Sequence, residues 1–334
     1  MTGVQVSTGW QVHGTDAVLL RNRHLSVTLL PGLGAKVWEV LDHRTGRQVL
    51  WQNPAVRPSP VAVGAAFDDV FSGGWDELFP NDMPEVIAGE GYPDHGEAWS
   101  PAWEWVVLDP AQDGSVSVRM RLRTAISACA LEKTVTLAPD ARHLTVETSI
   151  TSLSRRDLPF LWKQHVALDV SELARIDLPG GQVVLEDFGA PRAGGAGSRF
   201  PWPMLDVDGE GHDFGWTLGG DSGVSEFFYV NDVPEGWCSL TYDDGSGVGV
   251  SFDPSVYPSC WVFASYGGWR DLEVVVLEPC TGHPLSVLDG VAAGTHRILR
   301  AGETIRTSLT LVLYDGLSSV THVGSDGVVR GVPC

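Results

Sequence analysis

Period-two alternation of apolar and polar side chains dominates the middle of this chain. In V-S-V-R-M-R-L-R, residues 116–123, apolar side chains alternate with serine and arginine. Similar alternation recurs in residues 130–137 and 144–150, with a Pro-Asp-Ala turn at 139–141 between them. Because successive side chains of a strand point to opposite faces, this pattern predicts antiparallel strands with one buried face and one wet face. The three segments therefore predict a β-meander.

Further strands are predicted along most of the chain. We expect two within residues 17–30 and others at 36–41, 160–170, 248–252, 260–265, 272–278 and 304–314. Helical periodicity is weak, and only residues 171–176 and 285–293 predict a turn or two of helix. Since helices do not alternate with the strands, a doubly wound or (β/α)₈ fold is excluded. The sequence predicts one all-β domain over residues 1–334, a large sandwich of antiparallel sheets with few short helices.

Two long segments without periodicity interrupt the strands. Residues 53–80 contain four prolines and three glycines, and residues 180–220 are also rich in both. Long loops in compact domains are commonly functional, and loops placed over one sheet would form a cleft. The aromatic residues within 53–80 argue against disorder there.

The charge balance excludes several kinds of partner. The chain has 334 residues, with 22 basic against 42 acidic side chains and a formal net charge of -20. Nucleic acids and anionic membranes bind clustered lysine and arginine, which the sequence lacks. The N-terminus does not have the basic start and apolar run of a signal peptide, and no segment is apolar for the roughly 20 residues that span a bilayer. Five scattered cysteines without a C-x-x-C pair fit a reducing cytoplasm, where we expect the protein to work.

One apolar strand ends on a carboxylate, in L-E-V-V-V-L-E-P-C-T-G-H-P, residues 272–284. Residues 274–276 predict a buried strand, Glu278 stands at its end, and Pro279 is expected to stop ladder pairing. A buried carboxylate is costly unless it is paired, hydrogen-bonded or hydrated. A lone glutamate in this place is most often only a polar strand end, so a functional interpretation depends on other groups.

Two histidines supply such groups. His165 ends the segment W-K-Q-H, in which Lys163 shares its strand face while residues 162 and 164 share the other. His95 lies in the loop segment D-H-G-E. Each histidine is also compatible with a plain structural role, as a core histidine with a backbone partner or a solvated loop residue. With G-G-W-D-E at residues 73–77, they predict an acid–base site among aromatic residues.

The sequence contains no metal or cofactor motif. The histidines at 95, 165 and 283 lack the close spacing of H-x-H or H-E-x-x-H, so we expect no bound metal. No glycine-rich loop joins a strand to a helix, and G-x-S-x-G is missing. We therefore expect chemistry without a cofactor.

Five short motifs follow one another in a characteristic order between residues 25 and 315. They are G-G-W-D-E-L-F-P-N, H-G-E-A-W-S, W-K-Q-H, L-E-P-C-T-G-H-P and A-G-E-T-I-R-T-S-L-T-L. This order resembles the aldose 1-epimerase (galactose mutarotase-like) family. The resemblance implies a β-supersandwich that interconverts anomers or epimers of a free sugar by ring opening. It further implies His165 as the general acid at the ring oxygen, Glu278 as the general base at the anomeric hydroxyl, and His95 as the histidine that holds the substrate.

The chain departs from the family's pattern in two places. An arginine usually follows H-G by a few residues, whereas H-G-E-A-W offers Glu97 and Trp99. Upstream, G-G-W-D-E stands where Asn-Arg is usual. The chain is therefore similar to a divergent branch of the family.

These departures bear on the small-molecule partner. The carboxylates of Asp76 and Glu77 would repel a phosphate but can accept hydrogen bonds from sugar hydroxyls. Trp75 and Trp99 can cover the apolar face of a pyranose. Lys163 either meets an anionic group of the sugar or pairs with a nearby carboxylate. We expect a neutral carbohydrate as the substrate.

Two other functions are compatible with the same residues. A non-catalytic sugar-binding or sensor protein would keep the tryptophans without needing an acid–base pair. A glycoside hydrolase or lyase would need two opposed carboxylates, which Asp76 or Glu77 together with Glu278 could supply. The presence of both His165 and Glu278 favours the isomerase.

Overall fold

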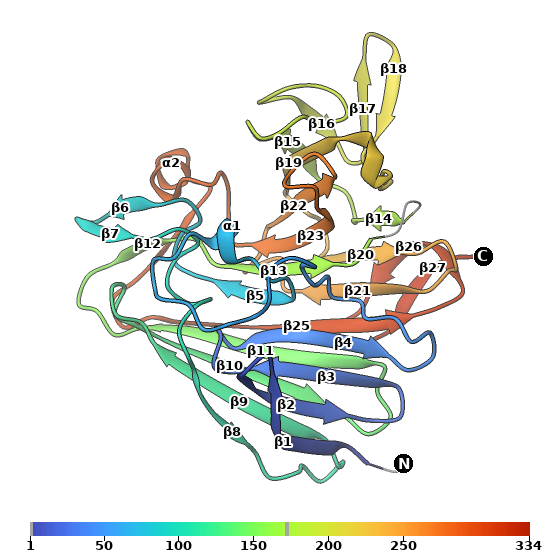
Figure 1. The fold of residues 1–334 in the computed structure, drawn as a ribbon. Coiled ribbons are helices and arrows are strands. Elements are labelled where there is room, and N and C mark those ends of the chain that lie inside the picture. The colour runs from blue at the N-terminus through green and yellow to red at the C-terminus, as the bar shows by residue number, and fades with distance from the viewer. Residues whose placement is uncertain (1–2, 171–173) are drawn as a thin grey trace. The chain divides into compact units, whose positions relative to one another are not determined.

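The computed structural model describes residues 3–170 and 174–334, and most of its regular structure is β (Figure 1). Residues 1–165 with 281–308 form one compact unit, unit 1, and residues 166–280 with 309–334 form unit 2. The helical elements of the described part are short: α1 Phe67–Val70, α2 Val287–Ala293 and the 3₁₀ turn η1 Gly220–Ser222. The predicted all-β class with few short helices is confirmed. The prediction of a single domain over residues 1–334 stays a prediction.

The first sheet of unit 1 carries the residues of most interest. Its strands follow the order β1–β2–β3–β4–β5–β13, with bounds Gln5–Val12, Thr15–Arg21, Leu25–Leu30, Lys36–Asp42, Trp75–Leu78 and Lys163–Leu168. The strands from β1 to β4 pair antiparallel through short connections. Strand β5 and helix α1 both lie inside residues 53–80, which the sequence predicted to be only a loop.

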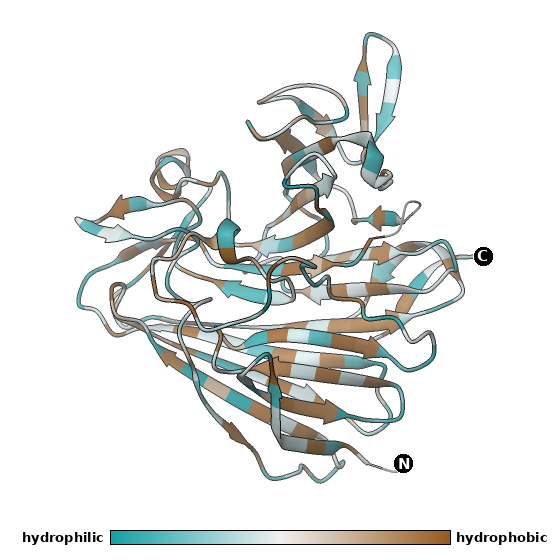
Figure 2. Ribbon diagram, viewed as in Figure 1, coloured by the Kyte–Doolittle hydropathy of each residue, from teal (hydrophilic) through white to brown (hydrophobic). Residues whose placement is uncertain are grey.

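The second sheet of unit 1 contains the predicted meander. Its strands β8, β9, β10 and β11 pair antiparallel in that order, with bounds Glu104–Val107, Val116–Arg123, Cys129–Leu137 and His143–Ser152. Apolar and polar residues alternate along these strands (Figure 2). The apolar side chains of these strands are buried in the core, whereas the side chains that alternate with them remain partly accessible. The prediction for these segments is confirmed.

The segment 160–170 differs from its prediction as one strand. Strand β12, Leu158–Phe160, pairs with β24, Arg297–Leu299, and the chain then re-enters regular structure at Lys163 as β13. Between them, the Leu161 N–H donates to the carbonyl of Pro80 and the Trp162 N–H to Thr281 Oγ1. Because these two N–H groups bond to residues outside the ladder, residues 160–170 do not form one continuous strand.

A further small hairpin, β6 Glu85–Ile87 with β7 Glu90–Tyr92, completes the regular structure of unit 1 apart from the start of β25, Thr304–Tyr314.

Unit 2 also contains two antiparallel sheets. One has the order β23–β22–β19–β15–β16, with bounds Glu273–Cys280, Ser259–Tyr266, Val224–Asn231, Gln182–Leu185 and Arg199–Pro201. The other has the order β14–β20–β21, with bounds Arg175–Asp177, Trp237–Thr241 and Gly247–Phe252, and β21 pairs onward with residues 309–314 of β25. Two hairpins extend from unit 2: β17–β18 (Met204–Val207, Glu210–Asp213) and β26–β27 (Leu317–Val323, Val329–Pro333).

Two expectations in unit 2 need correction. Strand β23 does not stop at Glu278, because Pro279 pairs in register with Cys260 and Cys280 with Ser259. Proline lacks only the backbone N–H donor, and its φ is compatible with an extended chain. Pro279 therefore removes one hydrogen bond from the ladder without ending β23. The turn of helix expected at 171–176 lies partly on residues outside those described, and the chain from Arg175 is strand β14.

The segment 180–220, which the sequence predicted to be a long segment without periodicity, is anchored to its sheet by one arginine. Arg192 pairs with Glu226 of β19, with Nη2 2.6 Å from Oε1, and its Nη1 donates to the carbonyls of Asp213 and Trp216 at 2.7 Å. Both charged groups are buried, so the ion pair and its hydrogen bonds hold the segment 180–220 against the sheet.

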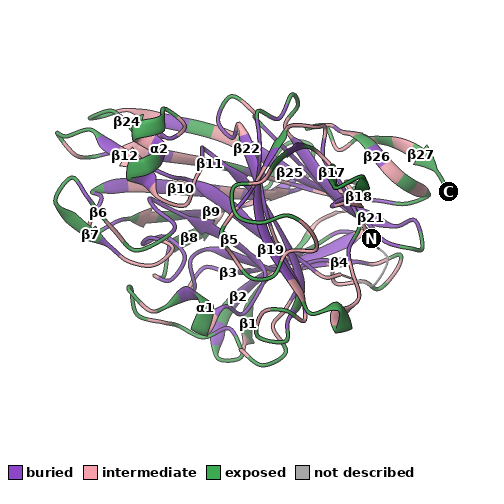
Figure 3. Cartoon of the chain, turned by 90° about the horizontal axis from the view of Figure 1, so that it is seen from above, coloured by how far each residue is buried: buried purple, intermediate pink, exposed green. Residues whose placement is uncertain are grey.

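Burial follows the sheets. The central strands are largely buried, whereas much of α2, β6 and β7 is exposed (Figure 3). Helices α1, η1 and α2 are too short to cross a membrane, and the described residues contain no membrane-spanning helix.

Candidate active site

Glu77 of β5 points into the core between the two sheets of unit 1. Its carboxylate pairs with Lys133 Nζ at 2.8 Å and accepts hydrogen bonds from Thr148 Oγ1 and Trp162 Nε1, each at 2.8 Å. Neither side chain of the ion pair is exposed. Lys133 and Thr148 belong to β10 and β11, so Glu77 ties the first sheet to the second.

Trp75 lies on the same face of β5 as Glu77. Its indole N–H donates to Gln164 Oε1 of β13 at 2.8 Å, and the ring is fully buried. The sequence grouped Trp75, Asp76 and Glu77 as sugar contacts, but side chains alternate along a strand, so only Asp76 can point to the opposite face. Trp75 and Glu77 have no surface on which to meet a ligand.

Asp76 forms a second buried ion pair on that opposite face. Its Oδ2 lies 2.6 Å from Lys36 Nζ, which also donates to the carbonyl of Gly73 at 2.7 Å. The other carboxylate oxygen, Oδ1, is buried and has no hydrogen-bond partner among the described residues. Burial raises the pKa of the Asp76 carboxyl, and the attraction of Lys36 offsets this only in part.

His165 lies on the Asp76 side of the sheet, in a mostly apolar setting. The rings of Phe67 and Phe71 lie nearly perpendicular to it, at centroid distances of 5.3 and 5.1 Å. Its Nδ1 is buried and accepts or donates no hydrogen bond within the described part of the chain. Burial, followed by the positive charge of Lys163, holds the pKa of His165 well below its ordinary value. His165 is therefore a neutral imidazole at neutral pH.

The ring nitrogens of His95 face carboxylates, whereas the ring of His165 faces phenylalanine rings. Its Nδ1 lies 2.9 Å from Asp94 Oδ1, and its Nε2 lies 4.0 Å from Asp82 Oδ2. Its ring stacks on Phe67, with centroids 4.1 Å apart and planes 10° from parallel. Burial lowers the pKa of His95, but Asp82 and Asp94 together outweigh it, so the pKa is raised. These carboxylates therefore favour the protonated form of His95 more than water does for a free histidine.

The backbone at the H-G motif explains why glycine follows the histidine. His95 has φ +57° and Gly96 φ +74°, both in the left-handed region. A Cβ on Gly96 would lie 2.2 Å from the carbonyl oxygen of Phe79. The His95 N–H meanwhile donates to the carbonyl of Asp82. The tight turn thus presents His95 to Asp82 through both its backbone and its side chain.

Lys163 is buried in an ion pair with Asp82. Of the two alternatives left open by the sequence, pairing with a nearby carboxylate is the one that the structure shows. Asp82 therefore stands between two cationic groups, Lys163 and the His95 ring. The sequence predicted that Lys163 and His165 share one strand face, and their contacts with Asp82 and the phenylalanines agree with it.

The two histidines form one cluster with opposite electrostatics. Their ring centroids are 6.4 Å apart and their planes are nearly perpendicular. The environment raises the pKa of His95 and lowers that of His165. Neighbouring titratable groups whose pKa values are pushed apart are a recurring property of acid–base sites.

Trp99 and Glu97 have structural contacts in this neighbourhood. Trp99 meets Phe67 edge-on at 4.9 Å and is buried, so it supports the aromatic wall beside the histidines. The Glu97 carboxylate accepts the backbone N–H groups of residues 125, 126 and 127 at 2.8–3.0 Å. Glu97 thereby fixes the turn between β9 and β10, and a role for Trp99 in stacking on a sugar stays a prediction.

Glu278 belongs to unit 2, near the end of β23. It pairs in register with Trp261 of β22, and its side chain is buried. The Trp261 ring in turn meets Tyr229 of β19 at 4.8 Å, edge to face. Glu278 is thus a carboxylate among large aromatic residues of its own sheet, and its catalytic role stays a prediction.

Sequence reasoning did not identify several residues of the cluster. Asp82, Lys36, Phe67 and Phe71 were not named, although the first two provide its carboxylate and cation contacts. Asp82 directly follows the quoted motif L-F-P-N, so its position beside a motif was the available signal. The two phenylalanines lie in and next to α1, inside a segment without periodicity, and no pattern marked them.

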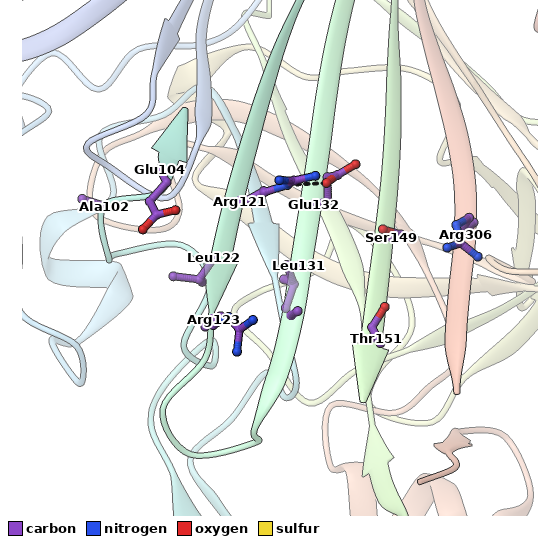
Figure 4. A pocket seen from close by; sticks show the side chains of 11 residues that line it. Ala102, Glu104, Arg121, Leu122, Arg123, Leu131, Glu132, Ser149, Thr151 and Arg306 are labelled. Carbon is purple, nitrogen blue, oxygen red and sulfur yellow. Dashed lines mark hydrogen bonds and ion pairs between the residues drawn. The ribbon is translucent and has the colours of Figure 1, made fainter. Parts of the chain in front are cut away.

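A separate hollow lies on the exposed face of the second sheet of unit 1. It measures about 660 Å³, and its lining includes Arg121, Arg123, Glu132, Thr151 and Arg306 (Figure 4). Arg121 Nε lies 2.5 Å from Glu132 Oε2, with both side chains substantially exposed. This hollow contains none of the histidines. Within residues 3–170 and 174–334, no three His, Cys, Asp or Glu side chains gather as metal ligands would.

Comparisons with known proteins identify the fold. No family model matches the sequence, and no curated protein matches it. Among solved structures, a Klebsiella pneumoniae protein with a provisional aldose 1-epimerase name superposes with a TM-score of 0.70 at 14% identity, covering 93% of this chain and 83% of that one. A galactose mutarotase-like protein from Clostridium acetobutylicum gives 0.66 at 13% identity, covering 94% and 100%.

The chain has the galactose mutarotase-like fold. The Slr1438 protein from Synechocystis also matches, with a TM-score of 0.66, 17% identity and coverage of 93% of this chain and 100% of that one. At such identities the likeness concerns architecture, and it agrees with the β-supersandwich that the motif order implied. Because a fold hosts several functions, the activity has to be argued from the residues.

Proposed function

We propose that this protein is an isomerase of the aldose 1-epimerase type, which interconverts the anomers of a free sugar by acid–base ring opening. The proposal rests on one observation: His95 and His165 lie 6.4 Å apart in unit 1, and their environments push their pKa values in opposite directions. Glu278 of unit 2 completes the proposed catalytic set, and its approach to the two histidines is part of the proposal.

The proposed chemistry requires two proton movements. One proton is delivered to the ring oxygen as the bond between C1 and that oxygen breaks, and another leaves the anomeric hydroxyl as the C1 carbonyl forms. Closure on the other face of the carbonyl reverses both movements and yields the other anomer. Histidine and glutamate suffice for these steps, so the proposal includes no cofactor and no metal. We assign the activity to the cytoplasm.

The charge of the cluster supports a neutral sugar as substrate. The ammonium group of Lys163 is already paired with Asp82, and Lys36 is paired with Asp76. An anionic substrate would have to compete with these buried carboxylates. A neutral pyranose needs only hydrogen bonds and apolar contact, which the histidines and the aromatic residues beside them can provide.

The structure weakens the two competing functions. A glycoside hydrolase would need two opposed carboxylates, but Glu77 is locked in the core with Lys133 and Asp76 is paired with Lys36. A purely binding protein was expected to present tryptophans, yet Trp75 and Trp99 are buried. Neither competitor explains why two histidines with opposing pKa shifts lie together.

Polarimetry of freshly dissolved pure anomers tests the proposal. The wild-type protein should accelerate mutarotation of a neutral aldose such as glucose or galactose, whereas Glu278→Gln should lose about 10²–10⁴-fold because it removes the proposed base. His165→Ala should also slow the reaction. Arg121→Ala, on the far hollow, is the matched control and should keep the wild-type rate. A wild-type protein that accelerates none of a panel of neutral aldoses would refute the proposal, and a chelator should leave the rate unchanged.

A further inference from the structure

The two histidines of the cluster differ in which groups hold their ring nitrogens. Both nitrogens of His95 face carboxylates, with Nδ1 2.9 Å from Asp94 Oδ1 and Nε2 4.0 Å from Asp82 Oδ2. His165 has no carboxylate contact among the described residues of unit 1. Its Nδ1 has no hydrogen-bond partner among those residues, and the rings of Phe67 and Phe71 lie nearly perpendicular to its own.

From this geometry we propose that His95, rather than His165, is the proton donor of the site, and that His165 serves as a neutral hydrogen-bonding group. The inference rests on the proposed function and reverses the roles that the family resemblance implied for the two histidines. Its substrate remains a free neutral aldose.

The carboxylates around His95 favour its imidazolium, against the effect of burial. Asp94 precedes it in the same loop, Asp82 follows β5, and the Asp76 carboxylate interacts with it electrostatically from β5. Lys163 of β13 opposes the charge, but its ammonium group is engaged by Asp82. From α1 the uncharged ring of Phe67 stacks on it, while the acidic residues 68 and 69 of that helix are exposed.

The surroundings of His165 disfavour a positive charge. Lys163 on its own strand, Lys36 of β4 and the imidazolium of His95 all repel a second cation. The phenylalanine rings replace water around it without offering a hydrogen-bond acceptor at Nδ1. Burial is the largest influence on the pKa of His165, which it lowers, and the three cations lower it further. A residue that is unprotonated at working pH is a poor source of the proton that ring opening consumes.

Ring opening takes up one proton at the ring oxygen and releases another from the anomeric hydroxyl. The Nε2–H of the His95 imidazolium passes its proton to the ring oxygen while the C1–oxygen bond breaks. The Glu278 carboxylate of the proposed function takes the proton of the anomeric hydroxyl as the carbonyl forms. The 4.0 Å gap between Nε2 and Asp82 Oδ2 leaves that nitrogen without a direct hydrogen bond to the carboxylate, so a ligand atom can meet it. After closure both protons have returned, and no net charge is transferred.

Titration of the imidazole carbon–proton signals by NMR tests the charge assignment without any sugar. His95→Gln and His165→Gln assign the two signals in the folded protein. His95 should titrate above pH 6.5, and His165 should remain neutral at pH 6.5, where a free imidazole is about half protonated. Asp94→Asn should shift the His95 midpoint to lower pH. A His165 signal that titrates above that of His95 would overturn the inference.

Kinetics then separate this inference from the proposed function. His95→Gln should reduce the maximal mutarotation rate about 10²–10⁴-fold. In Asp94→Asn the fall of the rate with rising pH should occur at a lower pH than in the wild type, because the pKa of the donor His95 is lower in the variant. If the wild type turns over a sugar and His95→Gln stays within threefold of it, His95 is not the donor although the proposed function stands. If no aldose is turned over, the proposed function fails while the NMR titration still decides the charges.

Discussion

Two polar regions of unit 1 show how differently the same residue types behave. On the outer face of the second sheet, Arg121 and Glu132 pair across neighbouring strands, but 56% and 39% of their side-chain surfaces are exposed. On the first sheet, Lys36 with Asp76 and Lys163 with Asp82 pair almost without exposure. The outer region has the large hollow, whereas the inner one has the histidines.

Burial, rather than the number of charged groups, therefore distinguishes a site from a surface. An exposed ion pair is solvated and screened by salt, so it contributes little to stability. In a buried cluster, burial and the weakly screened charges of neighbouring groups move the pKa values, and here they raise that of His95 and lower that of His165. Substitutions in the two regions should differ in size accordingly.

The largest effect on stability is expected for Lys133→Met. It leaves the fully buried Glu77 carboxylate with only Thr148 and Trp162, and loss of one partner of a buried ion pair costs about 3–5 kcal/mol. The midpoint of chemical denaturation should fall strongly. A double variant, Lys133→Met with Glu77→Leu, should recover much of the loss. Equal stability of the single variant and the wild type would remove the distinction between core and surface.

A smaller loss is expected for Lys36→Met, because its partner can take up a proton. Burial already raises the pKa of Asp76, so the variant should keep a neutral carboxyl at a cost of about 1–3 kcal/mol for a polar group with few partners. The folded state of the variant binds this proton more tightly than the unfolded state does. The variant should therefore be most stable at low pH and lose stability as pH rises through the folded pKa of Asp76.

Denaturation of Lys36→Met at a series of pH values measures this dependence, with Lys36→Arg as the matched variant that retains the cation. The difference between the two variants should widen as the pH is raised. A difference that stays constant with pH would show that Asp76 remains ionised in both.

The smallest effect is expected for Arg121→Ala in the outer hollow. Its ion pair with Glu132 is exposed, and such pairs contribute about 0.2–1 kcal/mol. High salt should reduce this contribution further, whereas the loss in Lys133→Met should be nearly independent of salt. A loss for Arg121→Ala as large as that for Lys133→Met would contradict the comparison.

The sequence allowed much of the fold to be predicted because the side-chain period is local information. The alternation at 116–123 became β9, and the apolar run at 274–276 lies within β23. Strand β5 was missed, since its four residues W-D-E-L carry no period and are buried on both faces. Burial of the polar residues of β5 depends on partners from β4 and β10, which a local pattern does not contain.

The candidate site could be predicted only in part. The motifs indicated His95 and His165, which the structure brings together. Once β5 is known to be a strand, alternation separates Asp76 from Trp75 and Glu77, as it separated Lys163 from Gln164. The role of Asp82 could not be read from the sequence, because its contacts with Lys163 and His95 join segments that are about 80 and 13 residues away.

A crystal structure of the Glu278→Gln variant with a bound neutral pyranose tests the central claim most directly. The sugar is expected to lie against His95 and His165, with the ring oxygen within hydrogen-bond distance of His95 Nε2 and the anomeric hydroxyl beside residue 278. A sugar bound only in the outer hollow near Arg123 and Arg306, or a residue 278 far from the sugar, would contradict it.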